Sequence, residues 1–416
     1  MRTVIDLCLA AFRFAIQEAL PAECVKRNLA FSASSTNLLT INNRSYHLNN
    51  NVHIVAFGKA ACGMVAGAEA AVGNHLLDGI ASVPVGSEIP SGLKTKFLTG
   101  ALNNLPDAEA LENANKIAEF LQKVRAQDQI ILFLISGGGS ALLPSPIDGI
   151  ILEEKLEVIR MLATNGADIK QLNLVRSALS KLKGGKLAQM GAPSKMISLI
   201  ISDVIGDPLQ LIASGPTVLD KSDVRTPQQV FDELGVKQKI PQNVAHLLSS
   251  SKISPTTEVC ESEVDVNNVI VCNNQQVLKL LAQHFQQNGQ VYPLIITSTL
   301  EGDTSQKKSL DTQSVVELCK KLGVKDNLQI DSTSWKDFKK VVLLFGGETT
   351  VKFDALLVGQ NCKGGRNQEF VLSTFYTLLK AKKNCSEDCG KYAFFSLGTD
   401  GQGIVELILK LVESVS

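Results

Sequence analysis

The chain has 416 residues, and its 41 lysines and arginines balance its 41 aspartates and glutamates, so its formal net charge at pH 7 is zero. A chain of this length is too long for one ordinary hydrophobic core, so two domains are predicted. The balanced charge gives no support for nucleic acid or a membrane surface as a partner. Nine cysteines and five histidines without regular spacing predict reduced thiols and argue against a zinc site.

Residues 1–20 have the apolar periodicity of a first helix, and Asp6 and Glu18 within them argue against a transit peptide. The longest apolar runs are too short to cross a membrane, and the N-terminus lacks a signal-peptide core. We therefore expect a cytoplasmic protein, with a mitochondrial form left open. The Asn- and Ser-rich residues 31–51 predict a surface loop with at most one short strand.

Strands and helices then alternate to the end of the chain. Buried strands are predicted at 52–57, 79–84, 130–135, 196–201, 269–272, 292–296, 341–345 and 393–397. Helices are predicted at 58–77, 107–124, 152–162, 169–189, 275–288 and 304–322, with short ones near Phe231 and Ala245. This alternation predicts an α/β protein with mainly parallel, helix-covered sheets, and a polar connector at 249–268 places the domain boundary near it.

The stretch that follows the strand 130–135 is the strongest local signal for a ligand. It reads Ser136-Gly137-Gly138-Gly139-Ser140, so the backbone can turn sharply and its N–H groups can approach an anion without a Cβ in the way. The loop is therefore a candidate phosphate-binding loop, and the alternative is a glycine-rich turn without a ligand, which is common after a strand.

Five predicted strands end in glycine beside a charged or hydroxyl residue. These strand ends are residues 58–59, 136–140, 203–207, 346–349 and 398–400. Strand-to-helix turns collect Gly, Ser and Asp for conformational reasons, but ligands of open α/β sheets bind beyond the carboxyl ends of the strands. Five such ends favour one shared crevice.

The residue types at these ends are those that phosphoryl transfer needs. Lys59 and Arg366 are candidate cations, the loop 136–140 is a candidate cradle of N–H groups, and Asp203 and Asp207 are oxygen ligands of the kind that Mg²⁺ requires. Lys59 has the alternative of a solvated lysine in a first helical turn, and Asp207 that of a turn residue before Pro208.

Two further cations lie at the border between the apolar and the polar face of the predicted helix 169–189. Arg176 and Lys183 share a stripe with Asn173 and Ser180, where they either line a wet helix face or contact an anionic substrate. The sequence contains neither a G-x-x-x-x-G-K-[ST] loop, nor a complete dinucleotide fingerprint, nor a G-x-S-x-G elbow.

Motifs along nearly the whole chain resemble those of the type-2 glycerate kinases. They are F-G-K-A from Phe57, N-N-L-P-D from Asn103, S-G-G-G-S-A-L-L from Ser136, L-N-L-V-R-x-A-L-S-x-L-K-G-G-x-L-A from Leu172, S-D-V-x-G-D-P from Ser202, A-S-G-P-T from Ala213, G-G-E-T-T-V from Gly346, G-G-R-N-Q-E from Gly364 and G-T-D-G from Gly398. The number and the order of these motifs make the resemblance specific.

The resemblance implies an ATP- and Mg²⁺-dependent enzyme that phosphorylates D-glycerate at its 2-hydroxyl and gives 2-phosphoglycerate. It also implies a Rossmann-like N-terminal domain, placed at 1–245, and a smaller α/β C-terminal domain, placed at 246–416. The family's proposed catalytic lysine and arginine fall on Lys59 and Arg366. We further expect Gly346, Gly347 and Glu348 to contact the nucleotide, and Asn367 to contact the substrate with Arg176 and Lys183.

The resemblance ends after G-T-D-G, where the family continues with further elements and this chain reads Gln402-Gly403-Ile404 and stops at Ser416. The sequence therefore predicts a divergent, truncated C-terminus. Two alternatives to an active kinase stay open at this point: an NAD(P)-dependent hydroxypyruvate reductase and an inactive truncated isoform. A homo-oligomer is also left open.

Overall fold

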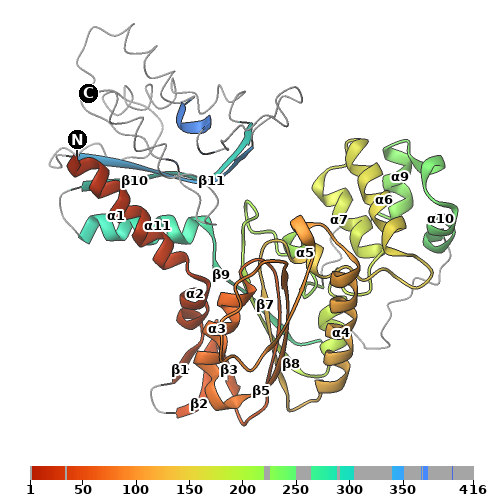
Figure 1. Ribbon diagram of the computed structural model, residues 1–416, viewed down its shortest axis with the longest axis horizontal. Helices are drawn as coiled ribbons and strands as arrows, with labels where there is room; N and C mark the ends of the chain where they lie inside the picture. The colour runs from red at the N-terminus through yellow and green to blue at the C-terminus, as the bar shows by residue number, and fades with distance from the viewer. Residues whose placement is uncertain are drawn as a thin grey trace, which may run out of the picture. The chain divides into compact units, whose positions relative to one another are not determined.

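A computed structural model describes residues 2–32, 35–219, 225–249, 264–287, 291–303, 340–350, 367, 369–372 and 396. The chain divides into two compact units, which are described separately below. One unit is Leu20–Asn273, and the other combines Met1–Ala19 with Asn274–Ser416. The predicted α/β class is confirmed (Figure 1).

The unit Leu20–Asn273 is built on a six-stranded sheet in which every neighbouring pair is parallel. Its order is β6 (Lys96–Gly100), β5 (Leu76–Pro84), β4 (Val52–Phe57), β7 (Ile130–Ile135), β8 (Lys195–Ile201) and β9 (Val266–Cys272). The chain builds outward from β4 in one direction and from β7 in the other, as in doubly wound nucleotide-binding sheets. Phe57 pairs with Ile135, so these two central strands end side by side at the switch point.

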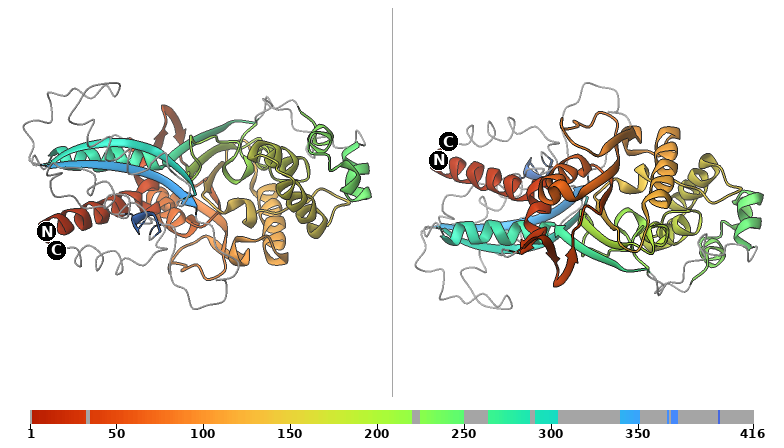
Figure 2. Two further views of the ribbon diagram at one scale, coloured as in Figure 1. Left: turned by 90° about the horizontal axis from the view of Figure 1, so that it is seen from above. Right: turned by 90° about the horizontal axis from the view of Figure 1, so that it is seen from below.

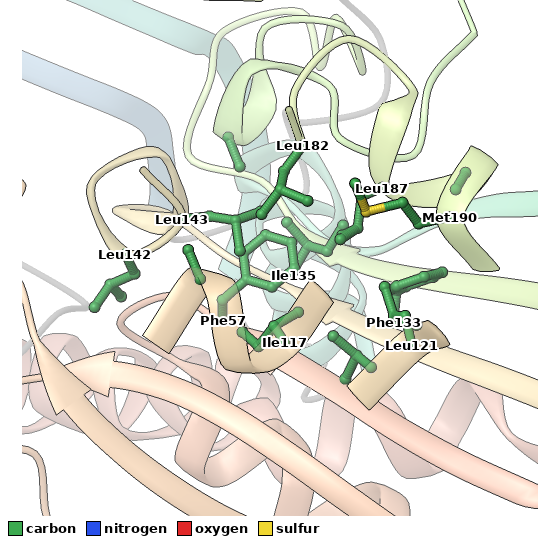
Figure 3. Close-up of a cluster of buried hydrophobic side chains, with 14 of the residues drawn as sticks. Phe57, Ile117, Leu121, Phe133, Ile135, Leu142, Leu143, Leu182, Leu187 and Met190 are labelled. Atoms are coloured by element: carbon green, nitrogen blue, oxygen red, sulfur yellow. The ribbon is translucent and has the colours of Figure 1, made fainter. Parts of the chain in front are cut away.

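Helices cover both faces of this sheet, which is why all six residues of β7 are buried. Helix α3 (Ala61–Val72) packs on one face, with α2 (Pro21–Asn28) against it, and α4 (Ala108–Val124) packs on the other (Figures 1 and 2). The short helices α5 (Gly139–Leu142) and α8 (Lys186–Gly191) lie beside α4. Figure 3 shows the core on that face, which includes Phe57, Ile117, Leu121, Phe133, Ile135, Leu187 and Met190.

Four helices gather beside the sheet at one end of this unit (Figures 1 and 2). They are α6 (Leu152–Thr164), α7 (Ile169–Ala178), α9 (Pro227–Glu233) and α10 (Gln242–Ser249). Their apolar faces form a separate core that includes Val158, Leu162, Val175 and Phe231. An apolar core of their own therefore holds these four helices together, separately from the core of the sheet.

The single long helix predicted at 169–189 is wrong, because the chain leaves the helical conformation after Ala178 and resumes it at Lys186. Gly184 and Gly185 have φ of 62° and 82°. Their N–H groups donate to the carbonyl oxygens of Ser214 at 3.0 Å and Gly215 at 2.7 Å instead of to the preceding turn. Apolar periodicity continues across this segment, but the helix ends at Ala178, and the positive φ of the two glycines keeps the backbone non-helical until Lys186.

The loop predicted at 31–51 is also wrong, because it forms an antiparallel sheet of β1 (Ala30–Ser32), β2 (Ser35–Ile41) and β3 (Arg44–His47). Asn42 and Asn43 join β2 to β3 with φ of 48° and 63°. Asparagine tolerates this conformation, which two-residue hairpin turns require. The asparagine-rich composition thus marked a hairpin turn rather than a loop.

The second unit pairs β10 (Val291–Asp303) with β11 (Lys340–Thr350) in parallel and packs α1 (Arg2–Ala19) and α11 (Asn274–Gln287) with them. Its described core includes Ala11, Ala15, Leu278, Leu281, Phe285 and Leu344. The helix predicted at 304–322 lies outside the described residues, as does the strand predicted at 393–397 except for Ser396.

The two compact units differ from the predicted division at residues 245 and 246 in two places. Helix α1 groups with α11 rather than with the sheet that follows it, and β9 completes the six-stranded sheet although it follows the polar connector. Strand pairing with β8, and not the composition of the preceding connector, decides where β9 belongs.

Candidate active site

The loops after β4 and β7 are tied together at the switch point of the sheet. The N–H of Lys59 donates to the carbonyl of Gly137 at 2.9 Å, and the N–H of Ala60 donates to Oγ of Ser136 at 3.0 Å. Gly58, with φ of 128°, allows this approach, because a Cβ there would lie 2.2 Å from Oγ of Ser136 and 2.7 Å from its carbonyl oxygen. The two strand ends therefore form one continuous polar edge.

Three side chains from distant parts of the sequence lie against the loop Ser136–Ser140, which we call the glycine loop. A Cβ on Gly137 would lie 2.1 Å from Oδ2 of Asp203, and a Cβ on Gly138 would lie 2.8 Å from Oδ1 of Asn104 and 3.1 Å from Cγ of Lys59. The structure therefore brings together the predicted residues Lys59, Asp203 and Ser136–Ser140. The absence of a Cβ at both glycines leaves the space that these side chains fill.

Asn104 was given no role by the sequence interpretation, although N-N-L-P-D was noted as a motif. Ala101, Asn103 and Asn104 have φ of 55°, 53° and 60°, a conformation that is costly for residues other than glycine and recurs at functional sites. Asp107 fixes this turn, because its carboxylate accepts from the N–H of Leu102 at 2.9 Å and caps α4 through the N–H of Ala110 at 2.8 Å.

The pKa of Asp107 follows from the same contacts. Burial acts to raise it, but the hydrogen bonds from backbone N–H groups outweigh burial and lower it below its usual value. The carboxylate that shapes the turn before α4 is thus held in its charged form.

The two predicted metal ligands differ in position. Asp203 is exposed beside Gly137, whereas Asp207, with φ of 52°, accepts a 2.5 Å hydrogen bond from Nδ2 of Asn273. The described residues contain no group of three or more His, Cys, Asp or Glu side chains that could hold a metal ion. Magnesium in phosphoryl-transfer sites commonly uses one or two carboxylates together with phosphate oxygens and water, and Asp203 beside the glycine loop fits that donor set.

Behind the glycine loop, hydrogen bonds lead from Ser140 to two predicted substrate residues. Nζ of Lys183 donates to both the carbonyl oxygen and Oγ of Ser140 at 2.8 Å. Oγ of Ser140 lies 3.0 Å from Oγ of Ser214, which donates to Oδ1 of Asn173 at 2.9 Å. Nη1 of Arg176 donates to the same oxygen at 3.3 Å. Lys183 and Arg176 are thus connected to the glycine loop although they do not share one helix.

Lys155, Arg176, Lys183 and Lys186 form what we call the cationic cluster. Burial, with the charges of Lys155 and Arg176, holds the pKa of Lys183 well below its usual value. Burial lowers the pKa of Lys186 to about 8, and its Nζ donates to the carbonyl oxygens of Ser177 at 2.9 Å and Ser180 at 2.5 Å. Basic side chains therefore gather in a region that water reaches poorly, where burial disfavours their charged forms.

Lys155 was missed by the sequence interpretation. It is 4% exposed on α6, and burial, then the charges of Lys186 and Arg176, lower its pKa to about 7. The available signal was its position, because Lys155 falls on the buried face of α6 with Leu152, Val158 and Leu162. A lysine on an apolar stripe is rarely there for packing alone.

The predicted residues of the C-terminal part are described only in part. Gly346 and Gly347 lie on β11, as does the backbone of Glu348, and a Cβ on Gly346 would lie 2.9 Å from Cδ1 of Leu278. Asn367 accepts a hydrogen bond from Oγ of Ser396 at 2.8 Å. Arg366 lies outside the described residues, so its convergence with Lys59 stays a prediction.

In the part of the chain that the structure describes, no helix has the length and apolar character needed to cross a membrane.

Two family profiles match the chain. The profile described as a domain of unknown function, DUF4147, matches residues 7–249, and that of the MOFRL family matches residues 341–404. Glycerate kinase of Rattus norvegicus is 34% identical over 425 residues, which cover 94% of this chain and 79% of the relative. Glycerate 2-kinase of Pyrococcus horikoshii is 32% identical, covering 88% of this chain and 77% of the relative.

A solved structure of a glycerate kinase is also similar to this chain. The crystal structure of a glycerate kinase from Thermotoga maritima superposes with a TM-score of 0.71 at 26% sequence identity, covering 91% of this chain and 81% of that one.

Proposed function

This chain belongs to the glycerate kinase family, and we propose that it transfers a phosphoryl group from ATP to the 2-hydroxyl of D-glycerate, giving 2-phosphoglycerate and ADP. The names of the relatives support the substrate, and the name of the archaeal relative supports the 2-position. The observation in this chain that carries the proposal is the glycine loop with Lys59 against it at the switch point of the sheet.

Phosphoryl transfer needs positioning and charge stabilisation more than covalent catalysis. In the proposal, the N–H groups of the glycine loop bind phosphate oxygens, and Lys59 neutralises the charge that develops on the transferred group. Lys59 lies just before Ala60, the N-cap of α3, at the helix end where the dipole disfavours a cation and favours an anion. Arg366 supplies the second catalytic cation.

A bound Mg²⁺ would neutralise phosphate charge and hold the phosphate oxygens in a fixed arrangement. Asp203, beside the glycine loop, and Asp207 are the residues that would hold it. The hydrogen bond from Asn273 orients the carboxylate of Asp207, and the carboxylate of Asp203 lies against Gly137.

The remaining assignments complete the proposed site. Gly346, Gly347 and Glu348 contact the nucleotide, and Arg176, Lys183 and Asn367 contact the acceptor substrate. A cytoplasmic location with a mitochondrial form, and a homo-oligomer, stay predictions.

The test is ADP release by the purified chain as a function of D-glycerate, ATP and Mg²⁺, with the position of the new phosphate read by NMR. Substituting Lys59→Met or Arg366→Met should lower kcat by about 10²- to 10³-fold, the usual cost of removing one group that stabilises transition-state charge. Because Lys59 is exposed, its substitution should leave the melting temperature unchanged.

The matched control is Lys116→Met, which removes an exposed lysine that pairs with Glu112 on α4 at 2.5 Å. It should retain full turnover. Full turnover in Lys59→Met would contradict the proposed site. If the chain oxidises NADH with hydroxypyruvate and releases no ADP from ATP in the presence of D-glycerate, the result would contradict the proposed reaction in favour of the reductase.

A further inference from the structure

Two buried nitrogen atoms, one in the cationic cluster and one on a neighbour of Arg176, have no hydrogen-bond partner among the described residues. They are Nζ of Lys155 and Nδ2 of Asn173, on side chains that are 4% and 6% exposed. Leaving a buried donor unpaired costs about 1–3 kcal/mol, and more for a charged donor. Buried donors without an acceptor are therefore rare in folded proteins. Arg176 donates to Oδ1 of Asn173 on α7, and α7 packs against α6, which carries Lys155; the charge of Arg176 also acts on Lys155.

The other cations of the cluster already have partners. Lys183 donates to Ser140, Lys186 donates to the carbonyl oxygens of Ser177 and Ser180, and Nη1 of Arg176 donates to Asn173. Those acceptors are neutral oxygens, so they satisfy hydrogen bonds without supplying negative charge. The cluster is therefore short of both an acceptor, for Lys155 and Asn173, and an anion.

From these contacts we propose that Lys155 and Asn173 bind the carboxylate group of the hydroxy-acid substrate, within the cationic cluster. A carboxylate supplies two oxygens and one negative charge, which suits two unpaired donors among cations. The inference deepens the proposed function and rests on it for the identity of the acid.

The connection to the glycine loop supports a carboxylate of a 2-hydroxy acid. Its carboxylate and acceptor hydroxyl stand on adjacent carbons, so the two ends of the reaction must lie close together. Ser140 belongs to the glycine loop and also accepts from Lys183 of the cationic cluster. Asn173 is also connected to Ser140, through Oγ of Ser214, so an acid bound at Asn173 would be anchored near the loop proposed to hold the phosphate.

The role proposed for Lys155 is specificity rather than chemistry. It holds a group that does not react, so its loss should weaken substrate and transition state equally. Substituting Lys155→Met should raise KM for D-glycerate by about 10- to 100-fold, the value of one hydrogen bond to a charged group, with kcat and KM for ATP unchanged.

Direct binding provides the second readout, without ATP. D-glycerate and D-lactate should raise the melting temperature of the wild-type protein, and glycerol, which lacks the carboxylate, should not. Lys155→Met should lose this response. Asn173→Asp places a carboxylate within the cluster itself, so it should also lose the response while its own melting temperature rises.

Lys181→Met is the matched control, since Lys181 lies two residues before Lys183 but forms a 2.6 Å ion pair with Asp148 at the surface. It should bind D-glycerate as the wild type does. An unchanged KM and thermal response in Lys155→Met would overturn the inference while leaving the kinase intact. Stabilisation by inorganic phosphate in place of carboxylates would also overturn it.

The two proposals fail separately. Carboxylate binding that depends on Lys155, without phosphoryl transfer, would sustain the inference and refute the kinase. Phosphoryl transfer to D-glycerate with the same KM in Lys155→Met as in the wild type would sustain the kinase and refute the inference.

Discussion

The glycine loop and the cationic cluster are two proposed anion sites that differ in construction and are joined at Ser140. The glycine loop uses backbone N–H groups and an exposed lysine, Lys59, so it forms without placing a charge in the interior. The cationic cluster instead buries Lys155 and Lys183, which are 4% and 2% exposed. The glycine loop forms because its glycines can adopt the required backbone conformation, whereas forming the cationic cluster costs the desolvation of its charged groups.

This difference teaches where stability and function oppose each other. In the glycine loop, the residues that suit a phosphate are also those that suit the turn. In the cluster, the residues that suit an anion destabilise the protein when the anion is absent, because burial disfavours their charged forms. The predictions below disturb one construction at a time.

The largest expected effect is on the cluster. Each tenfold change in proton affinity corresponds to about 1.4 kcal/mol, so lowering the pKa of Lys155 from 10.5 to about 7 represents a cost of up to about 4 kcal/mol at pH 7. Lys155→Met removes that cost and should increase the free energy of unfolding of the ligand-free protein. Urea denaturation would measure it, and a less stable variant would contradict the reasoning.

The same lysine fixes the sign of a pH dependence. Between pH 7 and 10.5 the unfolded chain holds the proton of Lys155 and the folded chain does not, so stability should rise with pH across that window. Below pH 7 both states hold the proton, and this contribution no longer varies. The slope of unfolding free energy against pH should be smaller in Lys155→Met by up to about 1.4 kcal/mol per pH unit.

The next effect is on the glycine loop. Gly58→Ala places a Cβ 2.7 Å from the carbonyl oxygen of Ser136 at a φ of 128°, and backbone strain with overpacking should reduce the free energy of unfolding by about 3 kcal/mol. Gly73→Ala is the control, with φ of 54° and nothing within 4 Å of its Cβ, and should cost about 1 kcal/mol. Equal losses in the two variants would show that the approach of the loops is not restrictive.

A smaller effect is expected at the turn that presents Asn104. Asp107→Ala removes the N-cap of α4 and should cost about 1 kcal/mol, whereas Asp107→Ser keeps an acceptor and should cost less. Because the pKa of Asp107 is lowered in the folded protein, its contribution is present above the usual value of 3.8 and is lost as the pH falls through the folded value. Denaturation at pH 7 and pH 3 should show a smaller difference between wild type and Asp107→Ala at the lower pH.

The smallest effect should come from Lys181→Met. This lysine pairs with Asp148, whose side chain is 87% exposed, so the pair should contribute about 0.5 kcal/mol or less and should weaken further in salt. Comparison with Lys155→Met separates a half-buried lysine that has a surface partner from a fully buried one. A large loss of stability in Lys181→Met would mean that the surface pair supports the cluster.

The sequence predicted the glycine loop well because its signals are local. Ile130–Ile135 is a buried strand, Ser136–Ser140 is the turn, and Gly58-Lys59 ends the neighbouring strand, as the residue types indicate. That both loops meet followed from one rule about parallel sheets. The α/β class was predictable from the alternation of strands and helices, and the family from the resemblance of its motifs.

The cationic cluster could be predicted only in part, because it depends on how helices pack. Arg176 and Lys183 were proposed on the premise of one helix, and the structure ends that helix at Ala178, so that Lys183 lies in the segment between α7 and α8. The two residues nevertheless connect to one site, through Ser140 and Asn173. Lys155 comes from a different helix, and periodicity can place it on a buried face without saying what it meets there.

Ser140 has a further consequence, because one residue serves both constructions. Its hydroxyl and carbonyl are held by Lys183, and the loop that it ends is the proposed seat of the phosphate. An occupant that shifts Lys183 would change its hydrogen bonds to Ser140, and thermodynamic reciprocity then requires each ligand to change the affinity for the other by the same factor. We therefore expect the affinities for the two substrates to be coupled rather than independent.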